Sequence, residues 1–174
     1  MPGGVTRTVR LDEELDLALR NRAKDERVTV NSLVNRAIWK FIEWDLPSEK
    51  IGMVDVSPVT VGKLMNEIDD ERLVELGRQI AGEVVKPFTE YLYGEFSVDS
   101  SILFFKRMSH YAGRGVFGDK TVNGKHVLVI KHNLGQKWSR YSGGVFEGVF
   151  GDLLGKKTKV NYTDDLCMVQ FPAD

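Results

Sequence analysis

Residues 6–44 read TRTVRLDEELDLALRNRAKDERVTVNSLVNRAIWKFIEW, and they set the expected architecture of the N-terminal part of the chain. The run over residues 5–11 alternates as a β-strand does, since successive side chains of a strand point to opposite faces. Val9 and Leu11 are expected to face a core. The other face carries the polar side chains Thr6, Thr8 and Arg10. A two-stranded ribbon is unstable unless one face is packed, so we expect this strand to pair with that of a second copy over helices.

Two amphipathic helical patterns follow the predicted strand. Asp12 is a good N-cap for the first helix, and acidic residues directly after it favour the positive end of the helix dipole. A break near residues 26–28 separates this helix from a second one, whose N-cap is expected at Thr29 or Asn31. The second pattern has a broad apolar stripe made of Leu33, Val34, Ala37, Ile38, Phe41 and Ile42. A unit of about forty-five residues is too small to bury this stripe alone, which favours an intertwined dimer.

The strand T-x-T-x-R-L over residues 6–11 and the segment Val28–Ser32 resemble the ribbon-helix-helix DNA-binding family of the Arc, MetJ and CopG kind. The resemblance covers about a quarter of the chain. It implies a homodimer that binds double-stranded DNA and acts in transcription regulation, and we expect a repressor. One departure concerns the turn over residues 24–27, which has no glycine, although the family often has one where φ is positive.

The resemblance also implies which residues contact DNA. A two-stranded ribbon fits the major groove, where each base pair presents its own pattern of donors and acceptors. We therefore expect the ribbon side chains to contact base edges, namely Thr6, Thr8 and Arg10. Free N–H groups at the start of the second helix form an anion site for a DNA phosphate. The expected phosphate contacts are Arg7, Thr29, Val30, Asn31 and Ser32.

Composition limits the remaining possibilities. The formal net charge is −1, so the basic groups that contact DNA must act locally, and we expect weak non-specific binding with dimers side by side on the operator. The lone cysteine, Cys167, excludes an intrachain disulfide and a cysteine-based zinc cluster. The N-terminus lacks the apolar core of a signal peptide, and no apolar run approaches the roughly 20 residues that cross a bilayer. We expect a cytoplasmic protein that does not contact membranes.

The predicted fold class is α+β, with a ribbon-helix-helix domain over 1–46 and a second domain over 51–174. Pro47 is expected to end the second helix, because the residue before a proline disfavours helical geometry. Residues 51–56 suggest a short strand, and helices follow as far as Gly113. The remainder reads as a hairpin, a helix and a closing hairpin, which predicts an antiparallel sheet. This order is weakly similar to the fold of haem-NO-binding, vinyl-reductase-like and TRAPP-type domains, some of which bind small hydrophobic ligands.

The predicted strand 126–132 and the helix after it carry the remaining candidate site. The junction between them has the candidate ligand-pocket residues His132, Trp138 and Tyr141, and a small-molecule effector is the expected ligand. Core packing with a tight turn is the alternative reading. Glycines along the same helix, from Gly143 to Gly151, suggest close packing against another helix or a second subunit.

Reaction chemistry has no candidate in this sequence. His126 and His132 would lie about 20 Å apart along one strand, so one metal ion cannot bind both. We predict no catalytic residues, no metal site and no cofactor, and hence a protein that is not an enzyme. The C-terminal domain is expected to sense a ligand or to drive oligomerisation. The alternative function is an antitoxin-like or adaptor module that uses the N-terminal unit mainly to dimerise and binds a protein through the C-terminal domain.

Overall fold

The computed structural model describes residues 5–113 and 115–173, which divide into two compact units on either side of the Leu46–Pro47 bond. In the N-terminal unit, helix α1 (Glu13–Glu26) precedes helix α2 (Val30–Lys40) and the π-helical segment η1 (Phe41–Asp45). Asp12 caps α1 by accepting a 2.8 Å hydrogen bond from the Leu15 N–H, as predicted. Thr29, one of the two expected residues, caps α2 in the same way through the Ser32 N–H at 3.1 Å.

Arg27 forms the turn between α1 and α2. Its backbone lies in the left-handed region, with φ 55° and ψ 41°, where an L-residue with a side chain is disfavoured. Its N–H bonds the Lys24 carbonyl at 3.2 Å, and the next N–H, that of Val28, bonds the Ala23 carbonyl at 2.9 Å. These bonds close the end of α1 and hold the conformation that a glycine would adopt without strain.

The expected strand over residues 5–11 is not a strand in the structure. Residues 5–12 have no regular secondary structure, and helix α1 is the first regular element of the described chain. A strand is defined by hydrogen bonds to a second strand, and no other described segment of this chain pairs with residues 5–12. The sequence alternation alone therefore does not produce a strand within one chain.

The prediction that Pro47 ends the second helix is wrong. Helical structure continues through η1 into α3 (Leu46–Lys50). Proline lacks an N–H and its ring clashes with the carbonyl four residues earlier. Directly before Pro47, the Leu46 N–H bonds the Phe41 carbonyl five residues back, which widens the turn that the ring must enter. The same arrangement precedes Pro87, where the Lys86 N–H bonds the Ala81 carbonyl.

The C-terminal unit contains a helical section, with no strand over residues 51–56, contrary to expectation. Ser57, Asp69 and Ser97 stand at the N-caps of helices in this section. The elements before the sheet are α4 (Pro58–Asn66), α5 (Asp70–Ile80), η2 (Ala81–Val85), α6 (Lys86–Tyr93) and α7 (Val98–Ala112). Gly113 ends α7 in the left-handed region, with φ 62°, as its position in the sequence predicts.

A four-stranded antiparallel sheet completes the unit, so the expected α+β class with an antiparallel sheet is confirmed here. The strands are β1 (Val116–Val122), β2 (Lys125–Lys131), β3 (Lys159–Tyr162) and β4 (Leu166–Pro172), in the order β1-β2-β4-β3. The Asn123-Gly124 turn joins β1 to β2 with both residues at positive φ, as the sequence predicts. Between the two hairpins, α8 (Gln136–Phe146) continues into the π-helical segment η3 (Glu147–Leu153).

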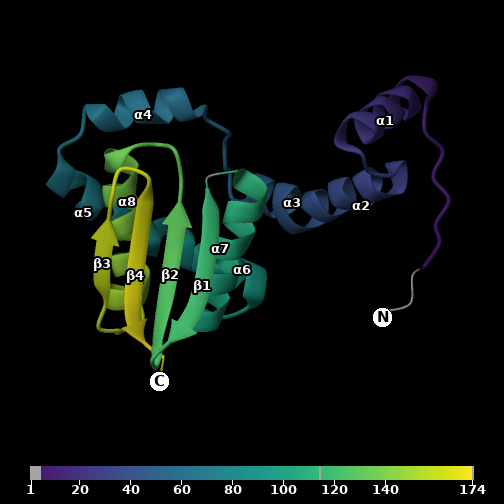
Figure 1. The fold of residues 1–174 in the computed structure, drawn as a ribbon. Helices are drawn as coiled ribbons and strands as arrows, with labels where there is room; N and C mark the ends of the chain where they lie inside the picture. The colour runs from purple at the N-terminus through teal and green to yellow at the C-terminus, as the bar shows by residue number, and fades with distance from the viewer. Residues whose placement is uncertain (1–4, 114, 174) are drawn as a thin grey trace. The chain divides into compact units, whose positions relative to one another are not determined.

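The helices of this unit cover one face of the sheet (Figure 1). The cross-strand pair Leu128–Val169 is fully buried, as is Cys167 opposite Ile130. Phe150 of η3 stacks on Phe171 of β4 with ring centroids 4.6 Å apart. Further aromatic contacts, which are stacked, tilted or edge-to-face, continue from the sheet to α7 and connect the helical layer to the strands.

Glycines allow α5 and α8 to touch backbone to backbone. A methyl group on Gly144 would overlap the Val74 carbonyl, and one on Gly77 would overlap the Tyr141 carbonyl. One turn beyond, a methyl group on Gly148 would lie 2.6 Å from the Ala81 Cβ. The expected close packing is thus against a helix of the same chain, and these three glycines form what we call the glycine seam.

Candidate functional site

The N-terminal unit carries the residues expected to contact DNA. Thr6, Arg7, Thr8 and Arg10 lie in the segment without regular structure, and all four are exposed. Thr29, Asn31 and Ser32 are exposed at the start of α2, where Val30 is partly exposed. The first N–H groups of a helix have no partner within the helix and bind anions. The structure thus brings residues 29–32 together at the start of α2. The other four expected DNA contacts lie in the irregular segment before α1.

Glu26 of α1 forms ion pairs with two arginines, and the pair with Arg36 connects α1 to α2. The Arg36 Nη2 lies 2.6 Å from the Glu26 Oε2, and Arg22 bonds the other oxygen of the same carboxylate. The Arg36 hydrogen bond lowers the pKa of Glu26, against the smaller opposing effect of desolvation and with added help from Arg22. Sequence reasoning missed this pair, because ten residues and a turn separate Glu26 from Arg36.

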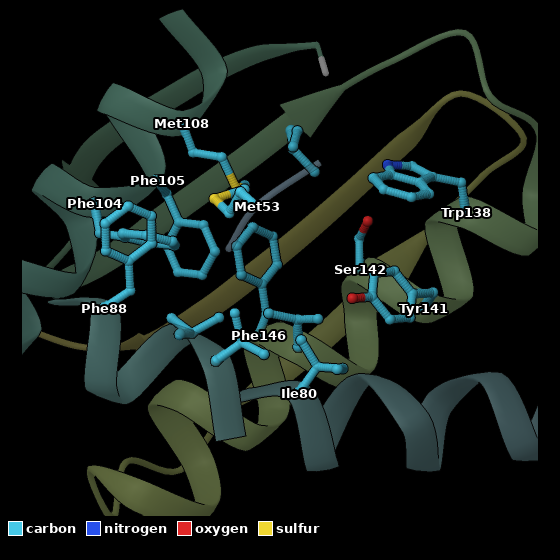
Figure 2. A pocket seen from close by; sticks show the side chains of 14 residues that line it. Met53, Ile80, Phe88, Phe104, Phe105, Met108, Trp138, Tyr141, Ser142 and Phe146 are labelled. Atoms are coloured by element: carbon cyan, nitrogen blue, oxygen red, sulfur yellow. The ribbon is translucent and has the colours of Figure 1, made fainter. Parts of the chain in front are cut away.

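The C-terminal unit contains a cavity of about 220 Å³ between its helices and β2. Figure 2 shows its aromatic and thioether side chains on one side and Trp138, Tyr141 and Ser142 of α8 on the other. The complete lining is Met53, Ile80, Val84, Val85, Phe88, Phe104, Phe105, Met108, Ile130, Trp138, Tyr141, Ser142, Val145 and Phe146. None of these side chains carries a charge at neutral pH, so the cavity is a mainly apolar chamber with a polar edge.

Two of the three predicted pocket residues, Trp138 and Tyr141, line this cavity, with ring centroids 5.3 Å apart. His132 does not line it. That side chain is buried beside Ser139, and burial lowers its pKa, against a smaller opposing effect of Asp165. His132 belongs to the hydrogen-bonded core, as the alternative reading anticipates for this residue.

Sequence reasoning missed the apolar side of the cavity. Its residues come from α5, η2, α6, α7 and the loop before α4, and no local motif joins segments so far apart. Phe88 and Phe104 are in edge-to-face contact, with centroids 5.5 Å apart, and form part of this side. The only local signal was the density of aromatic residues over 88–105, which equally fits a filled core.

Reactive groups elsewhere give no further site in the described part of the chain. No cluster of three or more histidine, cysteine or acidic side chains there is arranged to hold a metal ion. Burial raises the pKa of the Cys167 thiol to about 12, and Glu147 adds a smaller effect in the same direction. A thiol of this kind is a poor nucleophile, because the thiolate is the reactive form. No helix within 5–113 or 115–173 has both the length and the apolar character to span a membrane.

Searches of protein-family models, curated proteins and solved structures found no significant match to this chain.

Proposed function

We propose that this protein is a homodimeric, DNA-binding transcriptional regulator, most simply a repressor. Its N-terminal unit would insert a two-stranded ribbon into the major groove, and its C-terminal unit would sense a small molecule. The observation that carries the proposal is that exposed groups suited to DNA lie on both sides of α1 in the sequence. An exposed Thr-Arg segment precedes α1, and an exposed helix start capped by Thr29 follows it.

Exposed apolar side chains support the dimer. Val9 is 67% exposed, and Phe41 and Ile42 of η1 are 52% and 54% exposed. Exposing apolar surface to water costs a free energy of about 25 cal/mol per Å². Several large exposed apolar side chains in so small a unit therefore indicate a surface that binds a partner. A second copy would cover them and would also supply the partner strand that residues 5–11 need.

Recognition would then divide between two sets of groups. Arg10 is suited to bond guanine O6 and N7, and the threonines are suited to base edges and thymine methyl groups. The helix start and Arg7 are suited to phosphates, which fix register without reading sequence. With a formal net charge of −1, the chain has no overall attraction to DNA, so these local groups would provide the salt-dependent part of the affinity.

The test of DNA recognition uses the full-length protein. Selection from a random duplex library first gives the operator, and titrations at several salt concentrations then compare wild type with Thr8→Ala/Arg10→Ala. We expect the double variant to lose roughly 10- to 100-fold in operator affinity, with less effect on random duplex. Arg72→Ala, which removes an exposed charge of the C-terminal unit, is the matched control and should change neither value. Unchanged affinity and salt dependence in the double variant would refute the ribbon assignment.

The dimer has its own test. Ile42→Asp places a charge on the apolar surface, and Val59→Asp places the same charge on α4 at a side chain that is 70% exposed. By sedimentation equilibrium, wild type and Val59→Asp should be dimers and Ile42→Asp a monomer with reduced operator affinity. A wild-type monomer at micromolar concentration would contradict the proposal.

A further inference from the structure

Trp138 leaves one strong hydrogen-bond donor unused at the wall of the cavity. Its side chain is 8% exposed, and its Nε1 has no hydrogen-bond partner among the described residues. Figure 2 shows Trp138 beside Tyr141 and Ser142 at one side of the cavity. Buried polar groups in folded proteins nearly always have a partner, so an unpartnered indole N–H on a residue that lines a cavity indicates an acceptor supplied from outside the chain.

We propose that the cavity binds a small, uncharged, mainly apolar molecule with a hydrogen-bond acceptor, and that this acceptor bonds the Trp138 Nε1–H. The indole N–H is a donor only, so the ligand must provide an acceptor such as a carbonyl or ether oxygen. The remaining polar side chains of the lining, Tyr141 and Ser142, lie on the same side as Trp138 (Figure 2). The polar end of the ligand therefore lies against α8.

The lining excludes charged ligands. A carboxylate, phosphate or ammonium group would lose its hydration in the cavity without meeting an opposite charge, which is strongly unfavourable. The opposite side consists of phenylalanine, methionine and branched aliphatic side chains, including Phe88, Phe105 and Met108. Flexible thioethers adjust to ligands of different outline, and aromatic rings favour flat partners. A planar ring with a short polar substituent fits both features.

The volume sets the size of the ligand. An apolar protein cavity of about 150 Å³ holds a benzene molecule, so about 220 Å³ accommodates one ring with a small substituent. A long alkyl chain would extend beyond this volume. This inference rests on the part of the proposed function that assigns a small molecule to the C-terminal unit, and it does not depend on DNA binding.

The test compares two probes of nearly the same shape. Acetophenone has a carbonyl acceptor, and α-methylstyrene replaces that oxygen with a methylene group. Calorimetric titration of the full-length protein should give binding of both, with acetophenone roughly tenfold tighter, as expected for one satisfied buried donor. Absence of binding for both probes would overturn the proposal, as would tighter binding of α-methylstyrene.

Three variants locate the site. Trp138→Phe keeps an aromatic ring but removes the N–H, so it should abolish the preference for acetophenone. Val84 lines the cavity and is 38% exposed. In Val84→Phe the larger ring should fill the cavity and prevent binding of both probes. Val59→Phe makes the same change on α4, away from the cavity, and should bind as wild type does. A retained preference in Trp138→Phe, or normal binding in Val84→Phe, would contradict the assignment.

A measurement on the wild-type protein covers the case in which Trp138→Phe does not fold. Acetophenone should shift the NMR signal of the Trp138 indole N–H downfield, and α-methylstyrene should not. An unmoved signal at saturating acetophenone would refute the hydrogen bond. Operator affinity is measured separately on the same samples. Loss of probe binding with intact operator binding would refute this inference alone, whereas the reverse result would refute only DNA recognition.

Discussion

The His132 Nε2 lies 2.9 Å from the Ser139 Oγ, and this buried contact ties the end of β2 to α8. The other ring nitrogen, Nδ1, accepts the Leu134 N–H at 3.2 Å. An accepting Nδ1 places the proton of the neutral ring on Nε2, which therefore donates to Ser139. Both ring nitrogens are satisfied only while the ring is neutral.

Stability should therefore decrease in acid. Burial lowers the pKa of His132 below its ordinary value of 6.5, so between the folded and unfolded pKa values the unfolded chain binds more protons. The contribution of His132 to the free energy of unfolding is complete above about pH 6.5 and is lost as the pH falls toward the folded pKa. The slope from this one group is at most about 1.4 kcal/mol per pH unit. Urea unfolding between pH 5 and 8 measures it.

His132→Gln is the matching variant, since a glutamine amide can accept and donate but does not titrate in this range. We expect it to be less stable than wild type at pH 8 and to have a flatter slope between pH 5 and 6.5. An equally steep slope in the variant would assign the acid sensitivity to other groups.

Glycine-to-alanine substitutions should have opposite effects on stability inside and outside the glycine seam. Gly144→Ala places a methyl group on the Val74 carbonyl and should destabilise the C-terminal unit by about 1–3 kcal/mol. Gly62→Ala in α4 meets no atom within 4 Å and should stabilise by about 0.5–1 kcal/mol, because alanine is the better helix former. Thermal unfolding of both variants checks the prediction. A Gly144→Ala variant as stable as wild type would show that the two helices can separate without cost.

Cys167 should be chemically silent in the folded protein. The thiol is fully buried and its pKa is raised to about 12, so at pH 8 almost none of it is thiolate. Ellman's reagent at pH 8 should label no thiol in native protein and one thiol per chain in 6 M guanidinium chloride. Rapid labelling of the native protein would mean that β4 opens readily.

The cap of α1 can be tested without reference to DNA. Asp12→Ala removes the acceptor of the Leu15 N–H and should destabilise the first turn by about 1 kcal/mol. Amide hydrogen exchange at Leu15 should become several times faster, and Asp12→Ser should restore most of the protection. Equal exchange in all three proteins would show that the cap contributes nothing to α1.

Local chemistry explains which features could be predicted from the sequence. Asp12 and Thr29 are small polar residues placed directly before helical patterns, and the structure has both as N-caps. The Asn123-Gly124 turn and the closing hairpin likewise depend on neighbouring residues only. Of the candidate pocket, Trp138 and Tyr141 could be predicted because both lie on one helix beside the central strand.

Features that depend on distant partners could not be predicted. Pro47 was expected to end its helix, and the structure instead accommodates it, like Pro87, after a widened turn that no local motif indicates. The apolar side of the cavity comes from three stretches of chain that are distant in the sequence, namely the loop at Met53, residues 80–88 and residues 104–108, and no local pattern shows that they meet. The alternation over residues 5–11 predicts a strand, but no described segment of the chain pairs with these residues.

The two sides of α8 have different tolerance to sequence change. One side carries Gly144, whose backbone is fixed against Val74, and the other carries Trp138 and Val145 at the cavity. The glycine contact sets the distance between α5 and α8, and the side chains on the other side of α8 set the shape of the cavity. Substitutions that change the shape of the cavity would therefore fall on side chains such as Val84 and Met108. The glycines that set the distance between α5 and α8 would stay the same.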